Sequence, residues 1–289
     1  MNMENGSLSR MNSKRIKIII CTFLILFISF CAFIVYNFSV HNIIIMGQHN
    51  KIYFTSVTEL DLRKNRLSRN EEQKLKYFTN LKYLNLRMNE IDSVDFVEYM
   101  PDLERFEFMG SRFSFGILSP DDLSGQVISY SPNLKPIDYT PLKKLKKLKM
   151  LCISGTYNND ISFLKELPSL EYLQIDAFDL NEEMISCISS LNCLKNLSLC
   201  NASFVSTKFL KELKKLKNIT LYDCNIEEID VSDFMTLPEL EEIALLGTHI
   251  EQIDKLAQIK SLKVIRIGNE SYDESELKTL RNKGIVITN

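Results

Sequence analysis

One spacing of apolar residues recurs along most of this chain. An apolar residue is followed by two variable positions, a second apolar residue, one variable position and a third apolar residue, as in VTELDLRKNRL and LKYLNLRMNEI. The copies begin at Val57, Leu81, Leu103, Leu148, Leu170, Leu194, Leu216, Leu240 and Leu262. Successive copies start 24, 22, 45, 22, 24, 22, 24 and 22 residues apart. A period of this size indicates a stack of similar structural units.

The 45-residue interval equals two periods. Within it, a weakened copy of the pattern is formed by Gly125, Ile128, Tyr130 and Asn133. We therefore predict about ten repeats over residues 57–289. The sequence leaves the course of residues 109–147 open.

Within each copy, apolar and variable residues alternate, as they do in a β-strand with one buried face. Its second and third apolar residues point inward, while positions 3, 5, 7 and 8 face outward. One repeat cannot bury this apolar pair alone, whereas stacked repeats form a parallel sheet with a continuous core behind it. Between the strands, segments such as FLKEL at residues 163–167 have apolar residues at helical spacing. They predict short helices or 3₁₀ turns on the outer side.

The pattern resembles the leucine-rich repeat family, whose motif is Leu-x-x-Leu-x-Leu-x-x-Asn-x-Leu. The resemblance covers residues 57–289, and intervening segments such as DISFLKELPSLEYLQI are similar to the short bacterial internalin type. It implies an α/β repeat solenoid, a leucine-rich repeat horseshoe or arc with a parallel β-sheet on the concave face.

The resemblance also implies that side chains at motif position 9 hydrogen-bond to the turns of their own and adjacent repeats. Position 9 is occupied by Asn65, Asn89, Ser111, Asn133, Thr156, Phe178, Ala202, Cys224, Thr248 and Glu270. We interpret Cys224 as a structural thiol in this series. Less regular turns are expected at Phe178 and Ala202, which lack a polar side chain.

Both ends of a solenoid need covers. Residues 41–56 are predicted to be a linker and N-terminal cap, with a capping strand within residues 42–54. At the other end, Asp273 is expected to cap a helix over residues 274–282, with Glu276 completing a box-like arrangement and Gly284 ending the helix. A final strand is expected over residues 285–287.

Residues 18–50 contain no Lys, Arg, Asp or Glu, and residues 18–36 are almost wholly apolar. Nineteen residues at about 1.5 Å each can cross a hydrocarbon layer of roughly 30 Å. We predict a transmembrane helix over residues 18–40, preceded by a basic cytoplasmic tail over residues 1–17. One such span predicts a single-pass membrane protein, and the positive-inside rule predicts that its repeats lie outside the cytoplasm.

A cleaved secretory signal is the alternative, and it predicts a secreted repeat protein. This alternative fits less well, because the apolar run exceeds the usual 7–15 residues and no Ala-x-Ala-like site follows it.

Nothing in the sequence favours catalysis. The chain has three histidines, and it contains no Gly-rich phosphate loop, Gly-x-Ser-x-Gly or His-Glu-x-x-His motif. Five cysteines lie beyond the apolar segment, and their spacings match no metal site. The net charge of −2 gives no overall attraction to nucleic acid. We expect a non-catalytic protein without cofactor, metal or nucleic-acid partner.

The concave face is the candidate binding surface, because Tyr and Arg are enriched in binding hot spots. The candidate ligand-binding residues are Tyr83, Arg87, Met88, Arg105, Tyr172, Asp176 and Tyr222. The expected partner is a protein or glycan ligand on this face, together with the membrane through residues 18–40. A membrane scaffold acting through its apolar span is the other alternative.

Two lysine clusters, at residues 143–149 and 208–217, favour either an anionic partner or, more simply, solvated outer helices.

Overall fold

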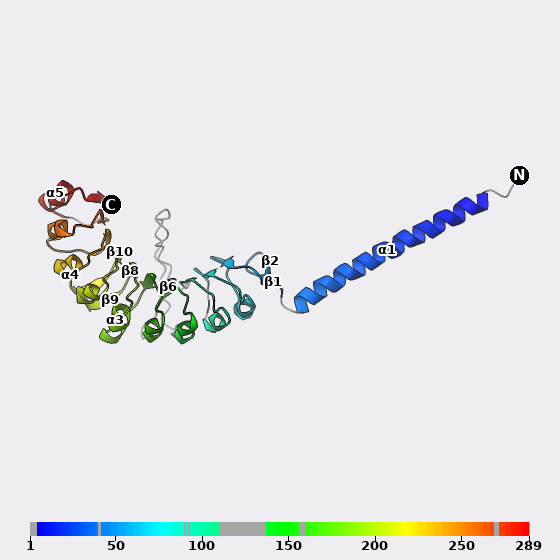
Figure 1. The fold of residues 1–289 in the computed structure, drawn as a ribbon, viewed down its shortest axis with the longest axis horizontal. Helices are drawn as coiled ribbons and strands as arrows, with labels where there is room; N and C mark the ends of the chain where they lie inside the picture. The colour runs from blue at the N-terminus through cyan, green and yellow to red at the C-terminus, as the bar shows by residue number, and fades with distance from the viewer. Residues whose placement is uncertain are drawn as a thin grey trace.

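The computed structural model describes residues 5–39, 42–89, 91, 93–109, 137–155, 160–268 and 272–288. A long helix, α1 (Asn5–Ser39), leads into an arc of stacked strand and helix units and extends away from it (Figure 1). The strands line the inner side of the arc and the helices its outer side (Figure 1).

The inner side is one ten-stranded sheet in which every neighbouring pair is parallel. Its strands are, in order, β3 (Glu59–Asp61), β4 (Tyr83–Asn85), β5 (Arg105–Phe108), β6 (Met150–Ser154), β7 (Tyr172–Asp176), β8 (Asn196–Cys200), β10 (Asn218–Tyr222), β12 (Glu242–Leu246), β13 (Val264–Arg266) and β14 (Val286–Thr288). Equivalent motif positions face each other, as Leu60 does Leu84. The predicted α/β solenoid is thereby confirmed.

The outer side carries the short helices that the spacing predicted, most of them 3₁₀. They are α2 (Arg69–Glu72), η1 (Leu75–Tyr77), η2 (Asp95–Tyr99), η3 (Thr140–Lys144), η4 (Ser162–Glu166), α3 (Glu182–Ser189), η5 (Thr207–Glu212), α4 (Val231–Met235), η6 (Ile253–Gln258) and α5 (Glu274–Asn282). Between them and the sheet lies one apolar cluster that runs from Ile44 to Ile285. Among the described residues this core is continuous from repeat to repeat, so each repeat stabilises its neighbours.

The structure changes the position of one predicted strand rather than the number of strands, which is ten. Strand β5 pairs directly with β6, with Phe106 beside Leu151, so no strand of a tenth unit lies between them. The tenth strand of the sheet is the C-terminal β14. The 45-residue interval between the copies at Leu103 and Leu148 fits either an extra repeat or an insertion between two adjacent repeats, and the sequence alone does not distinguish them. The residues that suggested the extra copy, Gly125, Ile128, Tyr130 and Asn133, lie outside the described residues.

Six of the described turns after the strands use a left-handed residue at motif position 8. Positive φ occurs there at Lys64, Met88, Ala177, Asn201, Asp223 and Gly247. The side chain at the next position then reaches the turn backbone, as the resemblance implied. The Asn89 amide donates to the carbonyls of Leu62, at 2.8 Å, and Leu86, at 3.1 Å, and its oxygen accepts from the Leu67 amide. Asn89 is 1% exposed, so these bonds satisfy groups that water does not reach.

Cys224 is a structural thiol, as expected. Its Sγ donates to the Leu199 carbonyl at 3.2 Å, and its backbone amide donates to Thr248 Oγ1 at 3.2 Å. Ser111, Asn133, Thr156 and Glu270, which were assigned to the same motif position, lie outside the described residues.

The expectation of less regular turns at Phe178 and Ala202 is wrong. The residues before them have φ of +59° and +49°, close to the +60° of Met88. Backbone bonds replace the missing polar side chains: the Ser203 amide donates to the Phe178 carbonyl, and the Asn225 amide to the Ala202 carbonyl. These contacts lead into a small parallel sheet of β9 (Ser203–Ser206) and β11 (Asn225–Glu228).

The N-terminal cap is a hairpin rather than a single added strand. Strands β1 (Ile43–Met46) and β2 (Lys51–Phe54) pair antiparallel and form a sheet separate from the solenoid sheet.

At the C-terminal end, α5 has the predicted bounds, Gly284 has φ +82° after it, and β14 closes the sheet. The expected cap is formed only by backbone: Asp273 makes no side-chain capping bond, and its carbonyl accepts from the Glu276 amide at 3.0 Å. The box-like arrangement with Glu276 is therefore not formed.

Helix α1 contains an apolar stretch, Lys17–Tyr36, which has a mean hydropathy of 3.1 and is not buried against the rest of the protein. Its length and composition suffice to cross a membrane, and it is not a core helix of the arc. The helix begins at Asn5, so it also includes most of the predicted basic tail.

Candidate functional site: the concave face

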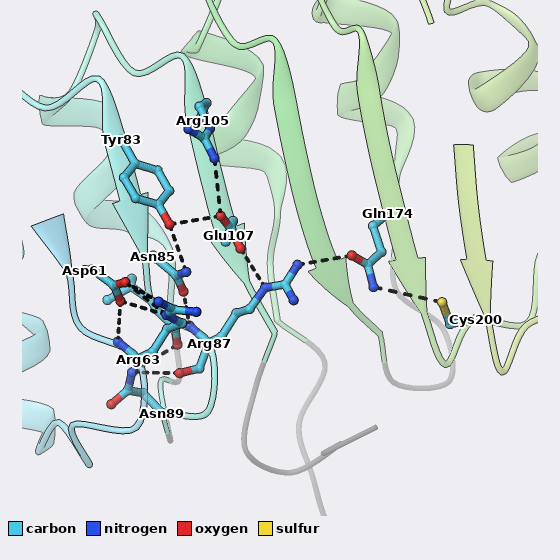
Figure 2. Close-up of polar contacts among 11 residues, drawn as sticks. Asp61, Arg63, Tyr83, Asn85, Arg87, Asn89, Arg105, Glu107, Gln174 and Cys200 are labelled. Carbon is cyan, nitrogen blue, oxygen red and sulfur yellow. Dashed lines mark hydrogen bonds and ion pairs between the residues drawn. The ribbon is translucent and has the colours of Figure 1, made fainter. Parts of the chain in front are cut away.

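The concave face is organised around Arg87, which follows β4. Its Nε lies 2.8 Å from Glu107 Oε2, and its Nη2 donates to Gln174 Oε1 at 3.1 Å. Gln174 in turn contacts Cys200 Sγ at 3.9 Å. One side chain thus connects strands β5 and β7 and, through Gln174, β8 (Figure 2).

The Arg87–Glu107 ion pair is largely withdrawn from water, with side-chain exposures of 16% and 10%. Burial alone lowers the pKa of Arg87, but the nearby Cys152 and Glu107 groups more than compensate, so its pKa is raised. Arg87 therefore remains charged at any physiological pH. The two charged side chains stay together because separating them would leave each charge buried without a partner and with little water to solvate it.

Next to this pair, Tyr83 and Arg105 form a preformed aromatic and cationic patch. The Tyr83 hydroxyl donates to Glu107 Oε1 at 3.0 Å and accepts from Asn85 Nδ2 at 3.0 Å. The Arg105 guanidinium lies 4.6 Å from the centre of the Tyr83 ring, and its side chain is 53% exposed. Cation–π stacking of this kind orients a charged group. Figure 2 shows the Tyr83 and Arg105 side chains both joined to Glu107.

In the middle of the sheet, over strands β6 to β8, inner-side residues such as Cys152, Gln174 and Ser198 are buried. Asp176, on β7, is 0% exposed, and its Oδ1 accepts from Asn201 Nδ2 at 2.8 Å. Burial raises the pKa of Asp176 to about 6, although the bonds from Asn201 and the Ala177 amide favour the carboxylate. The prediction that Asp176 lies on an exposed surface is wrong, because side chains of neighbouring strands crowd together on the inside of a curved sheet.

The buried thiols of this region are Cys152 and Cys200. Burial raises the pKa of Cys152 to about 11 and that of Cys200 to about 12. Both therefore stay protonated and weakly nucleophilic at neutral pH.

The other predicted binding residues are partly accessible. Tyr172 and Tyr222 are half-buried on β7 and β10, and burial raises the pKa of both hydroxyls. Met88 is also half-buried, and it occupies the left-handed turn after β4 rather than the strand itself. Of the predicted set, the structure brings Tyr83, Arg87 and Arg105 into one network through Glu107 and leaves Tyr222 apart from it.

Sequence reasoning placed Glu107 and Gln174 among the outward-facing side chains without assigning them a role. In the structure these two residues hold the network together. Arg87 and Glu107 have opposite charges and occupy outward positions of adjacent repeats, and this pattern could have predicted their ion pair.

The lysine cluster at residues 143–149 is neutralised by inter-repeat ion pairs. Lys144 lies 2.9 Å from Glu98, Lys146 lies 2.8 Å from Glu166, and Lys149 lies 2.7 Å from Glu104. The solvated outer face is therefore the better interpretation of this cluster. Over the described parts of the chain, no group of three His, Cys, Asp or Glu side chains is placed to hold a metal ion.

No protein-family model and no curated protein matches the sequence. The structure is similar to that of an internalin, InlF, from Listeria monocytogenes, with a TM-score of 0.58 and 20% identity over 83% of this chain and 63% of that one. It is similar to internalin C2 of the same organism, with a TM-score of 0.50 and 16% identity over 75% of this chain and 84% of that one. The chain thus spans less than two thirds of the InlF structure.

A third similar structure is mouse RP105 in the RP105/MD-1 complex, with a TM-score of 0.52 and 17% identity over 81% of this chain and 38% of that one. Together with the ten-stranded sheet, these likenesses establish the leucine-rich repeat fold of internalin-like type.

Proposed function

We propose that this chain is a membrane-anchored, non-catalytic binding module whose leucine-rich repeats recognise a protein or glycan through the concave sheet. The observation that carries the proposal is the patch of Arg105 stacked on Tyr83 and fixed by Glu107. A half-exposed guanidinium with a half-buried tyrosine, already ordered before binding, loses little side-chain entropy when a partner arrives.

The likeness to RP105 favours a protein partner, because that structure contains a second protein, MD-1. The chain is divided into a tail over residues 1–17, a transmembrane helix over 18–40, a linker and cap over 41–56 and the repeats over 57–289. Anchoring rests on the apolar stretch of α1, which also fits a cleaved signal and hence a secreted module. The positive-inside rule, applied to the basic tail, places the repeats outside the cytoplasm.

Photo-crosslinking from single positions tests the binding face. A photoreactive residue at position 105 of the full chain, expressed in cells, is expected to crosslink a discrete partner. The same residue at position 208, on the outer helix η5, serves as the matched control and is expected to give none. Arg105→Glu should weaken binding of that partner by tenfold or more, whereas Lys208→Glu should change it less than about twofold. Crosslinks that favour position 208, or an Arg105→Glu variant with unchanged affinity, would contradict the proposed binding face.

A further inference from the structure

The N-terminal hairpin has one apolar side that faces away from the repeats. In its antiparallel register, Ile43 lies opposite Phe54 and Ile45 opposite Ile52, so these four side chains share one face. Ile52 and Phe54 are 62% and 58% exposed, whereas Ile43 is 8% exposed and Ile45 is half-buried, so the apolar surface open to solvent on this face is formed by the two β2 side chains. The other face, with Ile44 and Met46, is buried in the core of the arc.

An apolar outer face is unusual for the end of a solenoid, where a cap normally presents a polar surface to water. The other exposed large apolar side chains of the described repeat region are Tyr99, Val205 and Val286. Tyr99 lines a hollow beside the hairpin, whereas Val205 lies on β9 and Val286 on the last strand. Apolar exposure is thus concentrated at the end of the arc that follows α1.

The hairpin is held firmly on the first repeat, so its outer face has a fixed direction. The Gly47 amide donates to Glu71 Oε1 at 2.6 Å, and Lys74 Nζ donates to the Ile45 carbonyl at 3.1 Å. The Gln48 amide donates to the Asn65 carbonyl at 2.9 Å.

The connection to α1 is too short to hold the hairpin far from a membrane. Helix α1 ends at Ser39 and β1 begins at Ile43, which allows a reach of at most about 14 Å. A headgroup layer is roughly 5–8 Å thick on each side of the hydrocarbon. If the apolar stretch of α1, which ends at Tyr36, spans the bilayer, the start of the hairpin lies no more than about 18 Å from the hydrocarbon, so the hairpin can reach the headgroups.

The hollow next to the hairpin has the composition of a membrane-interface surface. It measures about 570 Å³ and is lined by residues that include Asn42, Thr55, Lys76, Tyr77 and Tyr99. The Lys76 ammonium lies 5.3 Å from the centre of the Tyr77 ring. Tyr and Lys are enriched at the boundary between hydrocarbon and water, because each combines an apolar body with a polar end.

We propose that the outer face of the hairpin and this hollow rest in the headgroup layer of the membrane that α1 spans. The occupant of this surface is the lipid interface, and its contact fixes the angle of the arc relative to the membrane. The proposal rests on the anchor of the proposed function. It adds that the first repeats lie against the bilayer rather than swinging freely on a linker.

Tryptophan fluorescence tests this proposal with little background, because the chain contains no Trp. Three single variants of the full chain, Phe54→Trp, Phe27→Trp and Val205→Trp, are reconstituted into phosphatidylcholine and phosphatidylglycerol vesicles that contain lipids brominated near the headgroup or deep in the acyl chains. Phe54→Trp should be quenched by the shallow bromines and Phe27→Trp by the deep ones. Val205→Trp, an equally exposed position away from the hairpin, is the matched control and should not be quenched.

The outcomes separate the proposal from its premise. Quenching of Phe27→Trp without quenching of Phe54→Trp would overturn the membrane contact of the hairpin and leave the anchor intact. A blue-shifted but unquenched Phe54→Trp spectrum would do the same and indicate that a protein or second copy covers the face. If Phe27→Trp is not quenched, α1 does not span the membrane. Both the anchor and the proposed contact of the hairpin with the membrane would then be contradicted.

Discussion

Replacing Arg87 with methionine is expected to lower the free energy of unfolding by about 3–5 kcal/mol. The substitution keeps a long apolar side chain but removes the partner of Glu107, whose side chain is only 10% exposed. The carboxylate would then retain the Tyr83 hydroxyl at 3.0 Å and the more distant Arg105 guanidinium at 4.0 Å. Gln174 would lose its donor as well. Urea unfolding of the detergent-solubilised full chain measures the loss.

The matched control is Arg63→Met, because Arg63 pairs with Asp61 at 2.8 Å on the same face but with 58% and 39% side-chain exposure. A solvated pair of this kind contributes about 0–1 kcal/mol, so the control should unfold almost as the wild type does. Adding Glu107→Gln to Arg87→Met should recover part of the loss, since the unpaired charge disappears. Equal effects of Arg87→Met and Arg63→Met would show that the network does not stabilise the face.

Asp176→Asn is expected to stabilise the protein at pH 7.5 by about 2–3 kcal/mol and to change little at pH 4. The pKa of Asp176 is raised to about 6, chiefly by burial, from an ordinary value of 3.8. Between these values the native state holds a proton that the unfolded chain has lost. The stability contributed by this group is therefore complete below about pH 4 and is lost as the pH rises through about 6.

The amide variant has no charge to bury, so its stability should lack this decline. Thermal unfolding of wild type and Asp176→Asn between pH 4 and 8 provides the measurement. Asp179→Asn, which changes an exposed carboxyl in the same repeat, is the control and should follow the wild-type curve. Destabilisation by Asp176→Asn at pH 7.5 would mean that the carboxylate has a partner that compensates its burial.

The architecture was accessible from sequence because it depends on short-range periodicity. The alternation of Leu60 and Leu62 with polar neighbours recurs in each strand, and equivalent residues are indeed aligned across the sheet. The last helix and Gly284 followed from local signals that need no tertiary context. The position of the tenth strand did not, because the spacing of the copies does not show that Phe106 on β5 pairs directly with Leu151 on β6.

The site was predicted only in part, because alternation gives the direction of a side chain and not its access to water. It directed attention to Tyr83, Arg87 and Arg105, which the structure connects through Glu107, and their contact with a ligand stays a prediction. It did not reveal that Asp176 is fully buried, which depends on crowding by neighbouring strands. Nor did it show that Arg87 reaches Gln174, 87 residues away in sequence, because that contact depends on how the arc curves.

The side of the membrane on which the repeats lie distinguishes an external binding module from a cytoplasmic scaffold. Intact cells that express the full chain with a C-terminal tag are treated with protease, and the membrane-bound tag is measured before and after the membrane is opened. An externally anchored binding module predicts that the tag is lost from intact cells. Protection of the tag until the membrane is opened would place the repeats inside the cell and contradict this account, and a cytoplasmic membrane scaffold would then be the better description.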